Sequence, residues 1–191
     1  MRVITGSAKG RYLKMPGGGK TRPAMDKVKG STFNIIAALV DGARFLDLFA
    51  GSGNLGIEGL SRGGSYGAFV DASRECTKTI KENLEITNLS DKGEVFTMDC
   101  LKFLQTIRMD PFDVVFIDPP YLKGLLEPLL KYIPQCPLFT ESTLFIIERQ
   151  KKDIVGIENI PEYKLLDERK FGDTVLTFFR LVNNPTATNA A

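Results

Sequence analysis

The amino-acid sequence predicts an α/β fold built on a doubly wound sheet of seven strands, most of them parallel. From residue 45 onward, short apolar runs alternate with segments of helical periodicity, as in strand–helix–strand units with right-handed crossovers. Near the end of the chain, two strand-like runs flank a tight turn at residues 171–173, which predicts a hairpin with an antiparallel last strand. A short basic β-ribbon is expected to precede the sheet.

The expected elements follow in order along the chain. Val28, Phe33, Ile36 and Leu39 recur at helical spacing and predict a first helix over residues 25–40. Strands are expected at residues 45–49, 66–71, 93–98, 112–117, 143–148, 163–170 and 174–182. Helices are expected at residues 53–62, 73–87, 100–107 and 123–133. The segment 183–191 is small and polar, and is expected to fray.

Length and composition indicate an ordinary water-soluble protein with one main domain. The chain has 191 residues, 43% hydrophobic and 25% charged, which is enough to bury a full core. No apolar run is long enough for a membrane span, and no signal peptide is apparent, so we expect a cytoplasmic protein without a membrane partner. Three cysteines lie far apart and histidine is absent, so neither a disulfide framework nor a metal site is expected.

Positive charge is concentrated at the start of the chain. Residues 1–30 hold eight Lys or Arg and one acid, a net charge of +7, which leaves −5 for the remainder of a chain whose total is +2. A basic arm on an acidic body favours a polyanionic partner, although a solvated flexible tail is the alternative. Apolar residues interleave the charges, which indicates a short β-ribbon followed by a mobile loop at Gly17–Gly19.

This asymmetry leads to a division of the chain. We predict a basic extension over residues 1–24 that contacts RNA, a main domain over residues 25–182, and a frayed tail over residues 183–191. The protein is expected to act as a monomer. The candidate RNA-contacting residues are Arg2, Lys9, Arg11, Arg22 and Lys27.

The most informative stretch is Asp118-Pro119-Pro120-Tyr121, which directly follows an apolar run expected to be a buried parallel strand. Open α/β sheets bind ligands where such strands end. Proline lacks an N–H group, so the segment is rigid and presents only acceptors. A planar base with an exocyclic amine fits it, because the amine can donate to the Asp118 carboxylate and the Pro119 carbonyl while the ring stacks on Tyr121. The alternative is an ordinary proline-rich turn.

A glycine-rich turn follows the first expected strand. Gly51, Gly53 and Gly56 match the fingerprint of Rossmann-like dinucleotide sites, and Asp71 ends the next strand 20 residues after Gly51. However, Asp47 lies within the strand on the binding side of the turn, where it would repel a pyrophosphate and attract a cationic ligand. S-adenosylmethionine, with its ammonium and sulfonium groups, suits Asp47. A turn without a ligand is the alternative.

Two further acids fit the same ligand. Asp71 ends the second strand, where its carboxylate can accept the two ribose hydroxyls. Asp99 ends the third strand, where it can accept the adenine amine while the Cys100 backbone N–H serves the ring. Each could instead be a helix N-cap, because aspartate is favoured there and a helical pattern follows both. The cofactor-binding set is therefore Asp47, Phe49, Ala50, Gly51, Gly53, Asp71, Asp99 and Cys100, and the catalytic set is Asp118, Pro119 and Tyr121.

The two motifs together resemble motifs I and IV of class I S-adenosylmethionine-dependent amino-methyltransferases. The whole chain up to Leu181 is similar to the RsmD-type bacterial rRNA guanine-N2 methyltransferases, which modify 16S rRNA. The segments that carry this similarity outside the two motifs are Arg2–Gly6, Lys9–Arg11, Thr21–Pro23, Asp26, Val28, Phe33–Asn34 and Phe171–Thr174. The resemblance implies methyl transfer to the N2 amine of a guanine in 16S rRNA, free or within a small-subunit particle.

The chain departs from the family pattern near its first helix. Lys27-Val28-Lys29-Gly30 stands where the family usually has Arg-Val-Arg-Glu, and Ala24 stands where threonine is usual. The lysines keep the charge but lose the bidentate geometry of arginine, which bears on how substrate is positioned.

Two alternatives stay open at this point. An adenine-N6 methyltransferase shares the Asp-Pro-Pro-Tyr motif, although the chain leaves little room for a target-recognition domain. A non-catalytic RNA-binding or ribosome-assembly protein could also use the same scaffold. The sequence does not identify the nucleotide that is modified.

Overall fold

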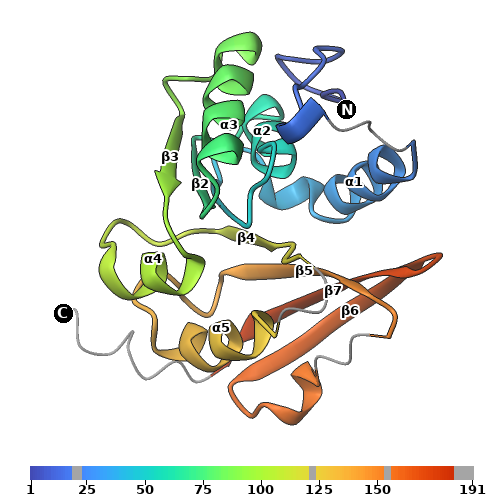
Figure 1. Cartoon of the computed structure of the whole chain (residues 1–191). Helices are drawn as coiled ribbons and strands as arrows, with labels where there is room; N and C mark the ends of the chain where they lie inside the picture. The colour runs from blue at the N-terminus through green and yellow to red at the C-terminus, as the bar shows by residue number, and fades with distance from the viewer. Residues whose placement is uncertain (19–22, 121–123, 153–155, 183–191) are drawn as a thin grey trace.

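The computed structural model describes residues 1–18, 23–120, 124–152 and 156–182, and confirms the seven-stranded sheet. The strand order is β3-β2-β1-β4-β5-β7-β6 (Figure 1). The strands are β1 (Arg44–Leu48), β2 (Tyr66–Asp71), β3 (Gly93–Thr97), β4 (Val114–Ile117), β5 (Leu144–Gln150), β6 (Tyr163–Phe171) and β7 (Thr174–Leu181). The first five pair in parallel, and β7 runs antiparallel to both β5 and β6, as the hairpin signal predicts.

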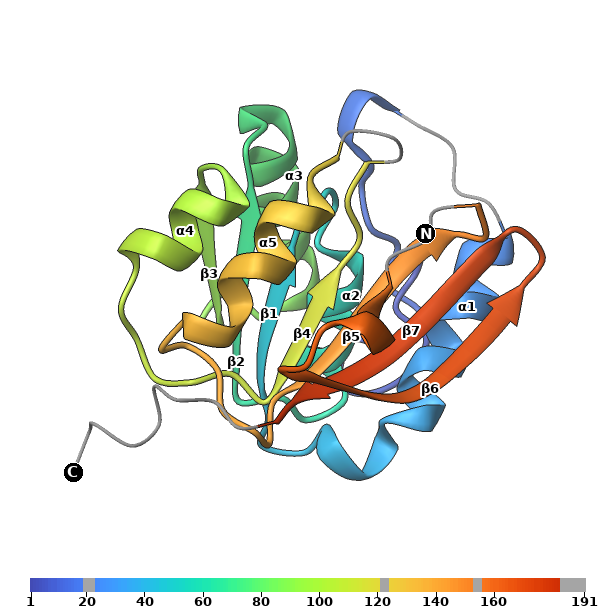
Figure 2. The ribbon, with the colours of Figure 1, turned by 90° about the horizontal axis from the view of Figure 1, so that it is seen from below.

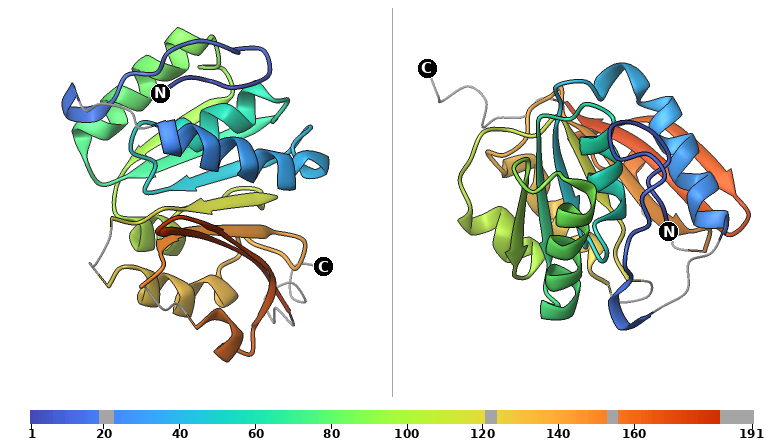
Figure 3. Two further views of the ribbon diagram at one scale, coloured as in Figure 1. Left: turned by 90° about the vertical axis from the view of Figure 1, so that its right-hand side faces the viewer. Right: turned by 90° about the horizontal axis from the view of Figure 1, so that it is seen from above.

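Helices cover both faces of the sheet (Figures 2 and 3). They are α1 (Pro23–Ile35), α2 (Asn54–Ser61), α3 (Arg74–Thr87), α4 (Cys100–Thr106) and α5 (Leu126–Tyr132). Single 3-10 turns are η1 (Pro16–Gly18), η2 (Ala37–Leu39), η3 (Ile133–Gln135) and η4 (Ile157–Asn159). The helix expected over residues 25–40 thus ends at Ile35 and continues only as η2. Among the described helices, none is long and apolar enough to cross a membrane.

Alternation along each strand divides the core between the two faces. Leu46, Val115 and Phe145 belong to the cluster on the α4–α5 face. Phe45 and Phe116 belong to the cluster on the opposite face, where their rings stack with centroids 5.8 Å apart under α1. Because side chains alternate with period two, the residues two positions beyond Phe116 of β4 and Ile146 of β5 also lie on the α1 face.

The N-terminal segment packs on α2 and α3, so the flexible-tail alternative does not describe residues 1–17. Val3, Ala8 and Leu13 are buried in the cluster that includes Ile57 and Leu84. Of the predicted two-stranded ribbon, the structure shows a short antiparallel contact without regular strands. It consists of one isolated bridge between residues 2 and 12, flanked by backbone hydrogen bonds from Val3 to the Arg11 carbonyl and from Leu13 to the Met1 carbonyl, both at 2.9 Å.

A buried acid anchors the N-terminal segment to α2. Glu58 of α2 is fully buried, and its carboxylate accepts the backbone N–H groups of Ile4 and Thr5 at 2.8 and 3.0 Å. These N–H groups are therefore not available to a partner strand. Lys29 of α1 lies 3.2 Å from the same carboxylate and donates to the Arg2 carbonyl at 2.7 Å. Burial lowers the pKa of Lys29, whereas Glu58 opposes that shift.

We predict that Glu58→Gln lowers the free energy of unfolding by about 3–5 kcal/mol, because it removes the buried carboxylate that pairs with Lys29 at 3.2 Å and with Arg62 at 2.7 Å. Urea denaturation followed by circular dichroism measures this change. The matched control is Glu127→Gln, which breaks an exposed helical ion pair with Lys131 and should leave the denaturation midpoint unchanged. Equal midpoints for both variants and the parent protein would contradict the role of Glu58.

Candidate functional site

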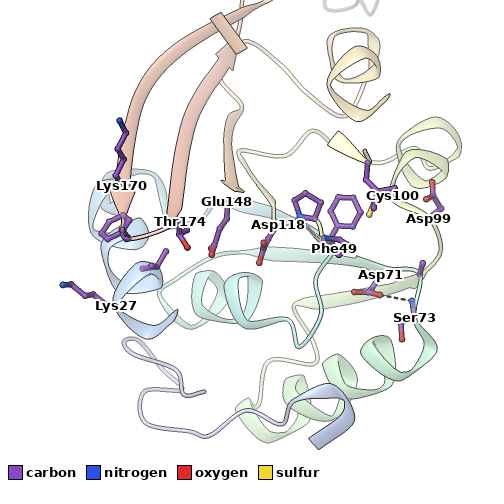
Figure 4. A pocket seen from close by; sticks show the side chains of 17 residues that line it. Lys27, Phe49, Asp71, Ser73, Asp99, Cys100, Asp118, Glu148, Lys170 and Thr174 are labelled. Carbon is purple, nitrogen blue, oxygen red and sulfur yellow. Dashed lines mark hydrogen bonds between the residues drawn. The ribbon is translucent and has the colours of Figure 1, made fainter. Parts of the chain in front are cut away.

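A cavity of about 1160 Å³ lies along the edge of the sheet where the parallel strands end (Figure 4). Its wall runs from Asp71 and Asp99, after β2 and β3, past Asp118 after β4, to the β6–β7 hairpin at Thr174. Parallel pairing brings these strand ends to one edge, which is where such sheets bind ligands.

Six residues of the predicted catalytic and cofactor-binding sets line this cavity. They are Phe49, Asp71, Asp99, Cys100, Asp118 and Pro119. Asp47, Ala50, Gly51 and Gly53 are not on its wall, and Tyr121 lies outside the described residues. The structure therefore brings together the strand-end acids and places the glycine-rich turn behind them.

The glycines of the turn serve packing and backbone conformation. A Cβ on Gly56 would lie 2.4 Å from the Phe69 ring, and one on Gly53 would lie 3.2–3.3 Å from three apolar side chains. These two glycines therefore let α2 approach β2, rather than opening space for a ligand. Gly51 has φ 55°, and a Cβ there would lie 3.9 Å from the Phe49 carbonyl oxygen, an ordinary contact. Phe49 itself adopts φ 62°, which is unusual for a non-glycine residue.

Asp71 ties the turn to the second strand. One carboxylate oxygen accepts the Gly51 N–H at 2.9 Å and the other accepts the Ser73 N–H at 2.8 Å. Ser73, and not Asp71, is the N-cap of α3, because its hydroxyl accepts the Cys76 N–H. A carboxylate has about four lone-pair sites, so Asp71 keeps capacity for further donors on its cavity side.

Asp99 is a helix cap and also lines the cavity. Its carboxylate accepts the Lys102 N–H at 3.0 Å and begins α4. Cys100 follows it, and burial raises the pKa of the Cys100 thiol to about 12, so the thiol stays protonated. The cap and ligand interpretations of Asp99 are therefore compatible, since one carboxylate can serve both.

Asp47 is a buried acid beneath the turn. It is 3% exposed, and its carboxylate accepts the Gly56 N–H at 2.9 Å. Burial raises its pKa to about 7, the Gly56 hydrogen bond opposes that shift, and the charge of Asp71 adds to it. The ionised form of Asp47 is thus destabilised unless positive charge comes close.

Asp118 has an acidic neighbour that the sequence interpretation missed. Glu148, in β5, lines the cavity beside Asp118, and Figure 4 shows both side chains projecting the same way. Burial raises the pKa of Asp118 well above its usual range, and the charges of Glu148 and then Asp47 add to the shift. Burial also raises the pKa of Glu148. The sequence contains a signal for Glu148, because this acid follows a continuous apolar run, as Asp118 does.

The far end of the cavity is basic. Lys27 of α1, one of the predicted RNA-contacting residues, lies there with Lys170 and Phe171 of β6. Arg2, Lys9 and Arg11 are exposed, whereas Arg22 lies outside the described residues. Lys29, where the sequence departs from the family pattern, lies in the buried ion pair with Glu58 and not on the wall of this cavity. Within the described part of the chain, no three His, Cys, Asp or Glu side chains are placed to hold a metal ion.

Comparison with known proteins identifies relatives over nearly the whole chain. The family model described as "Conserved hypothetical protein 95" matches residues 1–180. The Bacillus subtilis protein named "Putative rRNA methyltransferase YlbH" is 38% identical over 94% of this chain and 98% of its own length. The "Ribosomal RNA small subunit methyltransferase D" of Haemophilus influenzae is 32% identical over 96% of this chain and 94% of its own length.

A solved structure has the same fold. The chain described as "Putative methyltransferase yhhF from Escherichia coli" superposes with a TM-score of 0.81 and 29% sequence identity, over 95% of this chain and 97% of that one. The sheet order and the antiparallel hairpin are thus those of class I methyltransferases.

We predict that Asp47 makes stability fall as pH rises toward 7. Its folded-state pKa of about 7 exceeds the usual value of 3.8, so between these values the folded state holds a proton that the unfolded state has lost. Each pH unit in this window costs up to about 1.4 kcal/mol. Asp47→Asn should reduce this slope when the free energy of unfolding is measured from pH 4.5 to 7 without ligand, while the contributions of Asp118 and Glu148 to the slope remain. An unchanged slope would contradict the assignment.

Proposed function

The chain belongs to the Conserved hypothetical protein 95 family of RsmD-type and YlbH-type rRNA methyltransferases, and from that premise we propose that it methylates the N2 amine of a guanine in small-subunit (16S) rRNA. One observation carries the proposal: Asp118 and Pro119, the motif that suits an exocyclic amine, share a cavity wall with Asp71 and Asp99. The amine and a nucleoside-containing cofactor can therefore occupy one cavity.

S-adenosylmethionine fits the acidic end of this cavity. Asp71 and Asp99 offer acceptors for the ribose hydroxyls and the adenine amine, and Phe49 and Cys100 line the space between them. The positive charge of S-adenosylmethionine would also stabilise the ionised form of Asp47, because positive charge nearby stabilises a buried carboxylate. Gly51 would contribute through the turn that Asp71 holds. Ala50 and Gly53 are not on the cavity wall, and would contribute by fixing the conformation of that turn.

The reaction needs a neutral amine held with its lone pair free. When bound, S-adenosylmethionine supplies an electrophilic methyl group, whose bond to sulfur breaks with both electrons left on sulfur. The guanine N2 lone pair forms the new N–C bond, and N2 then releases one proton to water. Asp118 and the Pro119 carbonyl accept the N2 hydrogens, which favours a pyramidal nitrogen. Tyr121, outside the described residues, stays a predicted stacking partner.

Positioning supplies most of the acceleration in this proposal. Oriented reactants held at ~3–3.5 Å save roughly 7–11 kcal/mol of activation free energy. Asp118 and Pro119 are suited to this task because they directly follow β4, whose four residues are all buried. The base must leave any helix to reach them, so an unpaired or extruded guanine is expected. Lys27 lies on the cavity wall, where it is available for the phosphates around the base. Exposed Lys9 and Arg11 lie near the C-terminal ends of α2 and α3, where the Ser7 N–H donates to the Ser61 carbonyl and the Arg11 guanidinium to the Ile86 carbonyl.

Transfer of labelled methyl groups from S-adenosylmethionine to small-subunit particles from a deletion strain tests the function. We expect one labelled N2-methylguanosine after nuclease digestion and mass spectrometry. Labelled N6-methyladenosine would instead identify an adenine methyltransferase. Binding to the particles without any label would identify an RNA-binding or assembly protein. Comparison of purified rRNA with intact particles identifies the form that is methylated.

We predict that Asp118→Ala lowers kcat by at least roughly 10²–10³-fold, the usual loss when one preorganised group is removed from a reacting centre. Cofactor affinity should stay within a few-fold, because Asp118 faces the amine and not the adenosyl group. Single-turnover kinetics and isothermal titration measure the two effects.

Asp71→Ala is the matched control with the opposite expectation. It should weaken cofactor affinity by roughly tenfold or more, since hydrogen bonds to a charged group are worth about 1.5–3 kcal/mol each. Parent-like turnover by Asp118→Ala, or parent-like affinity of Asp71→Ala, would contradict the role assigned to that residue.

A further inference from the structure

Glu148 and Asp118 form a pair of adjacent carboxylates on one face of the sheet. Strands β4 and β5 pair in parallel with Phe116 opposite Ile146. Asp118 and Glu148 each lie two positions further along, so the register brings them side by side on the α1 face. Both line the cavity, and Figure 4 shows their side chains pointing into the same space.

The pair is not explained by contacts within the protein. Among the residues that the structure describes, none donates a hydrogen bond to either carboxylate, and burial and mutual repulsion disfavour their ionised forms. Buried polar groups normally have partners, and two carboxylates that share a site either hold a proton between them or bind donors. Donors on the cavity side would therefore relieve both carboxylates.

We infer that Glu148 is a specificity-determining residue: its carboxylate accepts the N1–H of the guanine whose N2 amine is held by Asp118. This inference rests on the proposed function and names the group that selects the base. Guanine has two neighbouring donors on one edge, N1–H and the N2 amine, which match two neighbouring acceptor side chains.

No other common base matches this pair. Adenine has an unprotonated N1 beside its N6 amine, and cytosine an unprotonated N3 beside its N4 amine. Either would place a ring lone pair against the Glu148 carboxylate. Uracil has no exocyclic amine. Specificity of this kind combines a good contact for one ligand with a repulsive contact for its competitors. A site built to hydrogen-bond a substrate N–H rejects analogues without it by up to roughly 10⁴–10⁵-fold.

The position of Glu148 also agrees with entry of the base from the basic end. Lys27 and Lys170 lie on the cavity wall beyond Glu148, away from Asp71 and Asp99. A nucleotide whose base reaches Asp118 from that side would pass Glu148, while its phosphates stay near the two lysines. The acidic and basic ends of the cavity would then hold the cofactor and the nucleotide, respectively.

The test compares guanine with 2-aminopurine at the methylated position of small-subunit rRNA. 2-Aminopurine keeps the N2 amine, but its N1 is an acceptor. We expect the parent protein to lose at least roughly 100-fold in kcat/KM on 2-aminopurine. Glu148→Gln should be slower on guanine, but its loss on 2-aminopurine should be at least tenfold smaller, because the Gln amide can donate to N1. The missing O6 affects both proteins equally and cancels.

Two further measurements make the outcome decisive. Glu141→Gln, an exposed site just before β5 and outside the cavity wall, should keep the parent discrimination. Isothermal titration should give Glu148→Gln a parent-like cofactor affinity. If Glu148→Gln turns over neither substrate, the ratio of its binding affinities for guanine-containing and 2-aminopurine-containing particles takes the place of kcat/KM.

An unchanged discrimination ratio in Glu148→Gln, by turnover or by binding, overturns the inference. Failure of the parent protein to methylate guanine-containing particles would instead overturn the proposed function. The two failures are therefore distinguishable.

Discussion

The parallel pairing of β1 to β5 is the constraint on which the rest of the molecule depends. It brings the ends of β2, β3 and β4 to one edge, where Asp71 ends its strand and Asp99 and Asp118 follow theirs, and it places Glu148 of β5 beside Asp118. None of these acids lies close to another in sequence. Their proximity is a property of the sheet, and a change that shifted the register of one strand by a single residue would turn its acid to the opposite face.

The same arrangement makes the ligand-free site electrostatically unfavourable. Asp47, Asp118 and Glu148 lie in or near the cavity on the α1 face, and burial raises the pKa of each. A cationic cofactor and a base rich in N–H donors would relieve this cost. The acids are thus suited to bind ligands because they are poorly solvated without them. Their burial lowers the free energy of unfolding of the ligand-free protein, as is common at functional sites.

Sequence patterns predicted the strands, the hairpin and most strand-end acids, because period-two alternation and acid-ended apolar runs are local signals. Three features depended on long-range contacts and were not predictable in this way. Glu58 anchors the N-terminal segment through its N–H groups, Phe69 packs against two glycines of the turn, and Glu148 becomes a candidate site residue because the sheet places it beside Asp118. The sequence pattern linked Lys29 to substrate positioning, whereas the structure buries it against Glu58.

The dependence of the N-terminal segment on α2 and α3 also imposes an order of folding. The N–H groups of Ile4, Ala8 and Lys14 donate to side chains that lie 54, 53 and 69 residues later in the chain. On the ribosome, the first residues therefore emerge long before their acceptors and stay undocked until α3 has left the exit tunnel. Such distant contacts close late in folding because the loop between them must be ordered first. The N-terminal segment thus acquires its structure only after α2 and α3 are available to it.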